Sequence, residues 1–222
     1  MKAIKNIIIT IITLTILVGL TGAGIIFLKG HEEYKDATTR INLENIVNKV
    51  QSNKGYTELK DVSEDFLIAI VAIEDRRFFE HKGIDVISLG RALVNNMKAG
   101  EIIEGGSTIT QQLAKNLYFS SDQELSRKVA ELILAKELEK KYSKDEILEL
   151  YINVIYYGND SYGIKEATTG YFNKLPSKIT YDEATLLAGV PQAPSYYDLT
   201  KNLGGAKEKQ KYVEKAITEN FK

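Results

Sequence analysis

The 222-residue sequence predicts an all-α protein in which one transmembrane helix precedes a helical domain. Three observations support this fold class. Residues 7–28 carry no charged side chain and are mostly apolar. Beyond residue 60, apolar residues recur at the three- and four-residue spacing of helices, without strand-like alternation of useful length. All three prolines follow residue 175, so little interrupts helices before that point.

The first apolar segment is long enough to cross a bilayer, which requires about twenty residues. We therefore expect residues 1–6 to be a short cytoplasmic N-terminus and residues 7–28 a transmembrane helix. Lys2 and Lys5 precede the span and favour this orientation, which places the rest outside the cytoplasm. The alternative is a cleaved signal peptide, but such segments have shorter apolar regions.

Composition excludes several classes of partner and site. The chain has 29 Lys plus Arg and 30 Asp plus Glu, which argues against a nucleic-acid partner. It has no cysteine, so disulfides and thiolate metal sites are excluded. Two histidines are too few for a histidine-rich metal site.

The remaining chain divides into a stalk and lead-in at residues 29–59, polar and weakly patterned, and a single domain at residues 60–222. Ser63 is a candidate N-cap, because acidic residues follow it in the first helical turn. Further helix starts are indicated by S/T-x-x-E capping boxes at Ser121 with Glu124, Ser143 with Glu146, and Thr180 with Glu183.

Glu74 ends an apolar run, residues 66–73. Apolar residues lie three, four and seven positions before it, so it shares their helix face and should be partly buried. Burial raises the pKa of a carboxyl and makes it a better base near neutral pH. The alternative is a helix-end acid paired with Arg76 or Arg77.

A second cluster is "EGGSTITQQLAKN", residues 104–116. The glycine pair gives a flexible entry, and Ser107 is expected to cap the following helix, whose free N–H groups can bind anions. Hydrogen-bonding side chains and a cation then follow at helical spacing: Thr108, Gln111, Gln112 and Lys115. They suit phosphate and sugar hydroxyls, although an ordinary capped, solvated helix is the alternative.

The third cluster is "RKVAE", which places Arg127 and Lys128 four and three residues before Glu131. All three side chains therefore lie on one side of a helix. The alternative is a surface salt bridge worth a few tenths of a kcal/mol.

Five stretches resemble, in order, the signature blocks of the peptidoglycan glycosyltransferases, the domain found in class A penicillin-binding proteins and monofunctional transglycosylases. They are "EDRRFFEHKGID", "GGSTITQQLAKN", "RKVAELILAKELE", "ILELYINVIYYGNDSYGIKEATTGYFNK" and "EATLLAGVPQAPSYYDL", and they cover about residues 60–200. The resemblance implies a lysozyme-like helical fold with a smaller, membrane-proximal lobe. It also implies a bacterial, single-pass membrane enzyme of cell-wall synthesis.

The implied reaction polymerises lipid II by an inverting β-1,4 transfer that releases undecaprenyl diphosphate. By this resemblance Glu74 is the general base, and Glu131 is a second catalytic glutamate near the donor diphosphate. Substrate binding is expected at Asp75, Ser107, Thr108, Thr110, Gln111, Gln112, Lys115, Asn116, Arg127 and Lys128. Glu131 is also a candidate ligand for a divalent cation, Mg²⁺ or Mn²⁺, and no organic cofactor is expected.

Three function classes stay open at this point: the polymerase, a hydrolase or lytic enzyme of lysozyme-like fold, and a catalytically silent scaffold. Partners expected from the resemblance are lipid II, the lipid-linked glycan, membrane lipid and other cell-wall synthesis proteins. We expect no transpeptidase activity, because the sequence contains neither SxxK nor KTG. Between the first two blocks, Ile102 and Ile103 are the strongest candidates for lipid contact. For the apolar residues of the preceding helix, burial in the core is an equal alternative.

Overall fold

The computed structural model describes residues 2–100, 105–119 and 124–220, and within them it confirms the all-α class. No strand occurs in these ranges, apart from an isolated bridge between Tyr156 and Tyr162. The α-helices are α1 (Lys2–Arg40), α2 (Leu43–Gln51), α3 (Glu64–Glu74), α4 (Val86–Ala99), α5 (Ile109–Tyr118), α6 (Leu125–Lys141), α7 (Lys144–Val154), α8 (Ile164–Phe172), α9 (Tyr181–Ala188) and α10 (Leu203–Asn220). Short 3₁₀ turns are η1 (Leu59–Asp61) and η2 (Pro176–Lys178).

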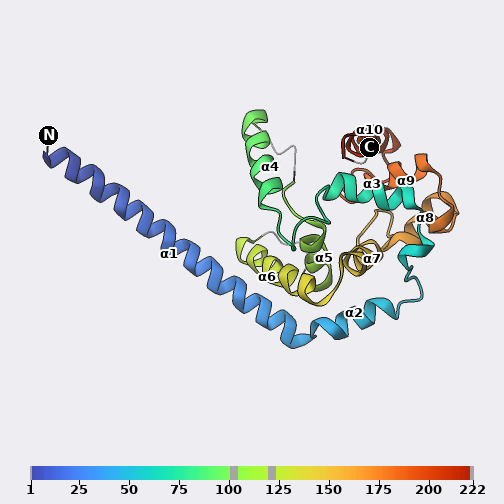
Figure 1. Cartoon of the computed structure of the whole chain (residues 1–222), viewed down its shortest axis with the longest axis horizontal. Coiled ribbons are helices and arrows are strands. Elements are labelled where there is room, and N and C mark those ends of the chain that lie inside the picture. The colour runs from blue at the N-terminus through green and yellow to red at the C-terminus, as the bar shows by residue number, and fades with distance from the viewer. Residues whose placement is uncertain (1, 101–104, 120–123, 221–222) are drawn as a thin grey trace.

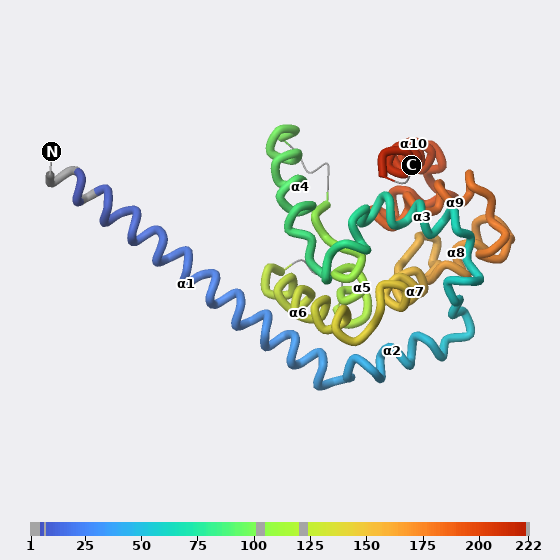
Figure 2. The backbone as a smooth tube through the Cα atoms, in the orientation of Figure 1, coloured from blue at the N-terminus to red at the C-terminus, as the bar shows by residue number. Residues whose placement is uncertain are grey.

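The helices form a compact body from which α1 and α4 project (Figure 1). One group consists of α3, α9 and α10, and a second places α5 between α6 and α7. The backbone trace in Figure 2 shows α2 passing beneath the second group before the chain turns up into α3. One side of the body therefore brings together helix ends that are far apart in the sequence. They are the ends of α3 and α10 and the starts of α5 and α6.

A single hydrophobic core joins these groups. Phe66 and Ile70 of α3, Leu113 of α5, Leu134 of α6 and Tyr151 of α7 are all fully buried within it. Burying such side chains is the main favourable term in folding, at roughly 1.5–3 kcal/mol each. The core therefore fixes the C-terminal end of α3 against α5 and α7, where the candidate site lies.

Two of the predicted capping boxes are confirmed. The side chains of Ser143 and Thr180 accept from the backbone three residues later, and the glutamates there bond back, which starts α7 and α9. Ser63 does hold the N-cap position of α3, but its side chain makes no capping bond.

The other two predicted helix starts, Ser107 and the pair of Ser121 with Glu124, differ from those in the structure. Thr108, and not Ser107, caps α5 in a complete capping box with Gln111, so the predicted start was one residue early. Glu124 holds the N-cap position of α6 without a side-chain bond. Ser121 lies outside the described residues.

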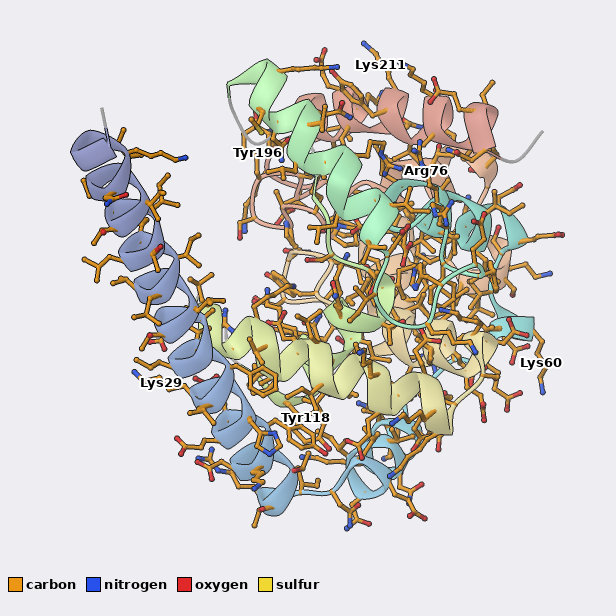
Figure 3. All side chains as sticks on the ribbon, turned by 60° about the vertical axis from the view of Figure 1, so that its left-hand side comes forward. Lys29, Lys60, Arg76, Tyr118, Tyr196 and Lys211 are labelled. Atoms are coloured by element: carbon orange, nitrogen blue, oxygen red, sulfur yellow. The ribbon has the colours of Figure 1, made fainter. Side chains whose placement is uncertain are left out.

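Helix α1 continues through residue 28, where the transmembrane segment was expected to end, as far as Arg40. By length and composition, its described part from residue 8 onward could cross a membrane. Its C-terminal part packs on α6, as Figure 3 shows near the labelled Lys29. A Cβ at Gly30 would lie 2.4 Å from the Ser126 carbonyl oxygen and 2.5 Å from Val129 Cβ. Glycine therefore permits this close crossing.

Residues 29–59, expected as stalk and lead-in, contain the end of α1 and all of α2. Leu43 and Val47 of α2 are buried in the common core. Tyr34 of α1 donates to Glu137 of α6, with 3.1 Å between the oxygens. This stretch is therefore packed on the body along much of its length.

Helix α4 carries large apolar side chains on its surface. Core burial is wrong for six of them: Val86, Ile87, Leu89, Leu93, Val94 and Met97 are all exposed. Ala92 is the buried residue of this helix. Ile102 and Ile103, the strongest candidates for lipid contact, lie outside the described residues.

Candidate active site

A cleft of about 840 Å³ opens between the end of α3, the start of α5, the first turns of α6 and one face of α10. Ten of the twelve site residues expected from the sequence line it: Glu74, Asp75, Ser107, Thr108, Gln111, Gln112, Lys115, Arg127, Lys128 and Glu131. The three clusters recognised separately in the sequence are thus parts of one site.

Glu74 is the last residue of α3 and is half-buried. Its Oε2 accepts a hydrogen bond from Gln112 Nε2 at 2.8 Å. Burial raises the pKa of this carboxyl, while donation from Gln112 and the nearby charge of Lys209 oppose the rise, and Asp75 adds to it. The alternative, an ion pair with Arg76 or Arg77, does not occur among the described residues, and Arg77 pairs with Glu80 and Asp85. A carboxylate in this setting is suited to take a proton near neutral pH.

Asp75 lines the cleft but uses its carboxylate to join two helices. It accepts from His81 Nε2 at 2.9 Å and from the backbone N–H of Ile109 at 3.0 Å. The N–H of Gly83 donates to His81 Nδ1, which leaves Nε2 as the donor to Asp75. Thr108 Oγ1 in turn donates to the Gly83 carbonyl at 2.8 Å. These bonds fix the start of α5 beside the end of α3.

Two of the expected binding residues lie outside the cleft lining. Thr110 is fully buried and donates to Glu139 Oε1 at 2.6 Å. Asn116 is exposed and its Nδ2 donates to the Gln112 carbonyl at 2.8 Å. Helical spacing turns Thr110 away from the face of α5 that carries Gln111 and Lys115. Asn116 lies one turn beyond Gln112, and its side chain bonds back to the helix and does not line the cleft.

The basic cluster is more buried than a surface salt bridge. Glu131 is 3% exposed; its Oε2 lies 2.8 Å from Lys128 Nζ and its Oε1 lies 3.5 Å from Arg127 Nε. Lys128 also donates to Ser107 Oγ at 2.9 Å, which links α6 to the residue before the α5 cap. The surface alternative is therefore wrong, and loss of the glutamate would leave buried positive charge. The Lys128 side chain is 44% exposed, so its ammonium group can reach a ligand in the cleft.

Lys209 of α10 is a cleft residue that the sequence did not indicate. It is half-buried, burial lowers the pKa of its ammonium group, and the charge of Glu74 opposes that change. The segment "AKEKQKYVEK" contains four lysines, and nothing local distinguishes this one. Helical spacing relates it to Tyr212 and Ala216, which also line the cleft. The spacing of these three residues on one helix face was the only sequence feature that could have indicated Lys209.

The donor set around Glu131 does not fit a preformed site for Mg²⁺ or Mn²⁺. Both of its oxygens face cations, Lys128 and Arg127. Over the described ranges, no group of three or more Asp, Glu, His or Cys side chains could hold a metal ion. The basic side chains of Lys115, Arg127 and Lys128 line the same cleft.

Comparisons with known proteins find related sequences over most of the chain. A family model described as Transglycosylase matches residues 42–218. Penicillin-binding protein 1F of Bacillus subtilis (strain 168) is 40% identical over 198 residues, which is 85% of this chain and 28% of that protein. Penicillin-binding protein 1A of Neisseria gonorrhoeae is 45% identical over 163 residues, which is 73% of this chain and 20% of that protein. The matched part of the chain thus spans 20% to 28% of these relatives' length.

Proposed function

Since this chain belongs to the transglycosylase family, we propose that it is a peptidoglycan glycosyltransferase that polymerises lipid II into glycan strands. One observation carries the proposal: a half-buried carboxylate of raised pKa and a cluster of basic side chains line the same cleft. A base and a site for a diphosphate are the two parts that the reaction needs.

In the proposed reaction, the 4-hydroxyl of the acceptor sugar attacks the anomeric carbon of the lipid-linked donor. A carbon–oxygen bond forms, and the bond from the anomeric carbon to the diphosphate breaks on the opposite face, which inverts the configuration. The hydroxyl proton passes to Glu74. The electron pair of the broken bond leaves with undecaprenyl diphosphate.

Glu74 suits the role of base because burial raises its pKa, while Gln112 and Lys209 keep its ionised form accessible. General-base catalysis of this kind typically contributes about a hundred- to ten-thousand-fold. We propose that Asp75 acts on Glu74 indirectly, because its carboxylate is engaged by His81 and the start of α5.

The diphosphate side of the cleft is formed by Lys115, Arg127 and Lys128, which all line it. A diphosphate leaving group needs neutralisation of its charge more than it needs a proton. Glu131 acts here by holding Arg127 and Lys128 in place. Ser107, Thr108, Gln111 and Gln112 complete the polar lining that we propose receives the substrate.

We propose that α1 anchors the protein in the bacterial cell membrane with its N-terminus in the cytoplasm. The exposed apolar side chains of α1 and the basic residues before them support this. A lipid-linked substrate keeps its diphosphate at the bilayer surface, so an anchored enzyme meets it at a higher effective concentration. The exposed apolar face of α4 provides a second contact with lipid.

Incubation of the purified full chain with lipid II tests the proposal. Polymeric glycan supports it, and the same preparation of Glu74→Gln should polymerise about a hundred- to ten-thousand-fold more slowly. Cleavage of preformed glycan into fragments would indicate a hydrolase, and no reaction in any lipid or detergent would indicate a scaffold. We also propose that these 222 residues do not carry transpeptidation, and covalent labelling by a fluorescent penicillin would contradict that part alone.

A further inference from the structure

A chain of two side-chain hydrogen bonds runs from the buried core to the carboxylate of Glu74. Gln112 Nε2 donates to Glu74 Oε2 at 2.8 Å, and the Tyr151 hydroxyl lies 3.1 Å from Gln112 Oε1. We infer that Tyr151 is a positioning residue for the reaction: it orients the Gln112 amide so that the amide N–H holds the ionised Glu74 carboxylate. This inference rests on the proposed role of Glu74 as general base.

The three residues come from three helices that meet behind the cleft. Glu74 ends α3, Gln112 lies in the second turn of α5, and Tyr151 lies in α7. Figure 1 shows α5 and α7 side by side in the body, in direct contact, and the Glu74–Gln112 hydrogen bond connects the end of α3 to them. Tyr151 is fully buried and does not line the cleft, so it cannot contact substrate there.

The direction of the hydrogen bonds follows from the chemistry of the groups. An ionised carboxylate only accepts, so the NH₂ group of Gln112 must face Glu74. The amide oxygen then faces Tyr151, whose hydroxyl must donate. Burial raises the pKa of Tyr151 well above its ordinary value, and the nearby charge of Glu74 raises it further, so this hydroxyl keeps its proton.

A reversed amide would have two consequences. Its oxygen would face the Glu74 carboxylate, which is favourable only when Glu74 is protonated. Its NH₂ group would face Tyr151, whose hydroxyl hydrogen would then need a different acceptor. Among the described residues Tyr151 makes no other side-chain hydrogen bond, so reversal would strand a buried donor. Tyr151 therefore favours the amide orientation that stabilises ionised Glu74.

Other groups also act on Glu74 and must be held constant in a test. Asp75 and Lys209 affect its ionisation from the end of α3 and from α10. Tyr157, which follows α7, is fully buried and senses the charge of Glu74, but its hydroxyl lies 3.4 Å from the Ile152 carbonyl. Tyr157→Phe is thus a matched control, since it removes a buried hydroxyl close to Glu74 without touching Gln112.

The test compares Tyr151→Phe with Tyr157→Phe in the full chain, kept in detergent. The carboxyl ¹³C signal of Glu74, assigned by its loss in Glu74→Gln, is titrated by NMR, and kcat/KM with lipid II is measured over the same pH range. For Tyr151→Phe we expect the titration of Glu74 to move to higher pH by about one unit, and the acid limb of kcat/KM to move with it. At low pH this shift corresponds to a tenfold loss of kcat/KM. The rate should recover at high pH, and Tyr157→Phe should leave both curves in place.

A second pair of variants keeps the test independent of a single substitution. Gln112→Met removes the donor itself, so it should raise the Glu74 titration at least as far. Adding Tyr151→Phe to Gln112→Met should then produce no further shift, because the amide that transmits the effect is gone. An additional shift of similar size in the double variant would overturn the inference.

The remaining outcomes separate this inference from the proposed function. An unchanged Glu74 titration in Tyr151→Phe, or a rate loss that is equal at every pH, means that Tyr151 only supports the core, and the inference fails. A shifted Glu74 titration with an unshifted rate profile keeps the hydrogen-bond chain and rejects Glu74 as the base. In that case the proposed role of Glu74 as base fails, while the structural inference and the lipid II activity itself both stand.

Discussion

The hydroxyl of Ser126 donates a 2.6 Å hydrogen bond to Glu33 Oε1, which joins the apolar N-terminal helix to the first turn of α6. The next residues of α6 are Arg127 and Lys128, two of the three cleft cations to which we assign the diphosphate. The helix that we propose as the membrane anchor is therefore fastened beside the proposed phosphate site. In the proposed membrane topology, this arrangement would keep the cleft close to the bilayer surface.

The close crossing at Gly30 predicts that Gly30→Ala destabilises the protein. Alanine favours a helix over glycine by up to about 1 kcal/mol. At this position, however, its Cβ would overlap Ser126 and Val129, and such overpacking costs about 1–3 kcal/mol. We expect a lower melting temperature and faster hydrogen exchange in residues 30–40 in detergent. Gly19→Ala is the control, because nothing lies within 4 Å of its Cβ position, and an equal response of both variants would contradict the docking.

The burial of Glu131 predicts that Glu131→Gln loses both activity and stability. The substitution removes the partner shared by the buried Arg127 and the partly exposed Lys128. Breaking a fully buried pair costs about 3–5 kcal/mol, and we expect a smaller loss here because solvent screens Lys128. Thermal unfolding and lipid II turnover should both be strongly impaired. Glu208→Gln is the control, since its pair with Lys211 is fully on the surface and should contribute little. A variant of Glu131 with normal stability and turnover would show that the buried pair has no role.

The raised pKa of Glu74 predicts that Glu74→Gln is more stable than the native chain at neutral pH. Folding raises this pKa, so the folded state holds the proton more tightly than the unfolded state does. Native stability therefore falls as pH rises from the unfolded value, about 4.3, through the folded one. Glutamine cannot ionise and avoids this loss. Its advantage in melting temperature should be present at pH 7 and absent near pH 4, and the opposite pH trend would show that Glu74 is stabilised by ionisation.

The exposed apolar face of α4 predicts a membrane contact independent of α1. Replacing Leu93 and Met97 with serine removes two side chains that are 61% and 75% exposed, so the fold should keep its helical circular dichroism. In a chain lacking residues 1–28, sedimentation with anionic liposomes should decrease. Serine at the exposed Tyr196 and Tyr212 is the control. Unchanged sedimentation would show that α4 does not bind lipid.

The sequence alone was sufficient to predict the all-α fold class, the partial burial of Glu74, and the position of Arg127, Lys128 and Glu131 on one side of a helix. These follow from local spacing, because residues three and four apart share a helix face. It missed the cap at Thr108 by one residue, since Ser107 and Thr108 are both good caps and tertiary bonds from Thr108 to Gly83 decide between them.

Other features depend on contacts between distant segments. Thr110 belongs to a buried bond with Glu139, and Lys209 reaches the cleft only because α10 packs on α3. The docking of α1 at Gly30 depends on the path of α6. The contacts of Thr110 and Gly30 leave no periodic signal in the sequence, and Lys209 is marked only by its helical spacing to Tyr212 and Ala216.

The most direct test of the account is the turnover of lipid II by Glu74→Gln at neutral pH. The substitution is nearly isosteric, and the new amide oxygen can still accept from Gln112, so the fold should persist. Without the base, we predict that polymerisation falls by about a hundred- to ten-thousand-fold, while the variant still unfolds cooperatively. Near-normal polymerisation by the folded variant would contradict the assignment of Glu74 as the general base.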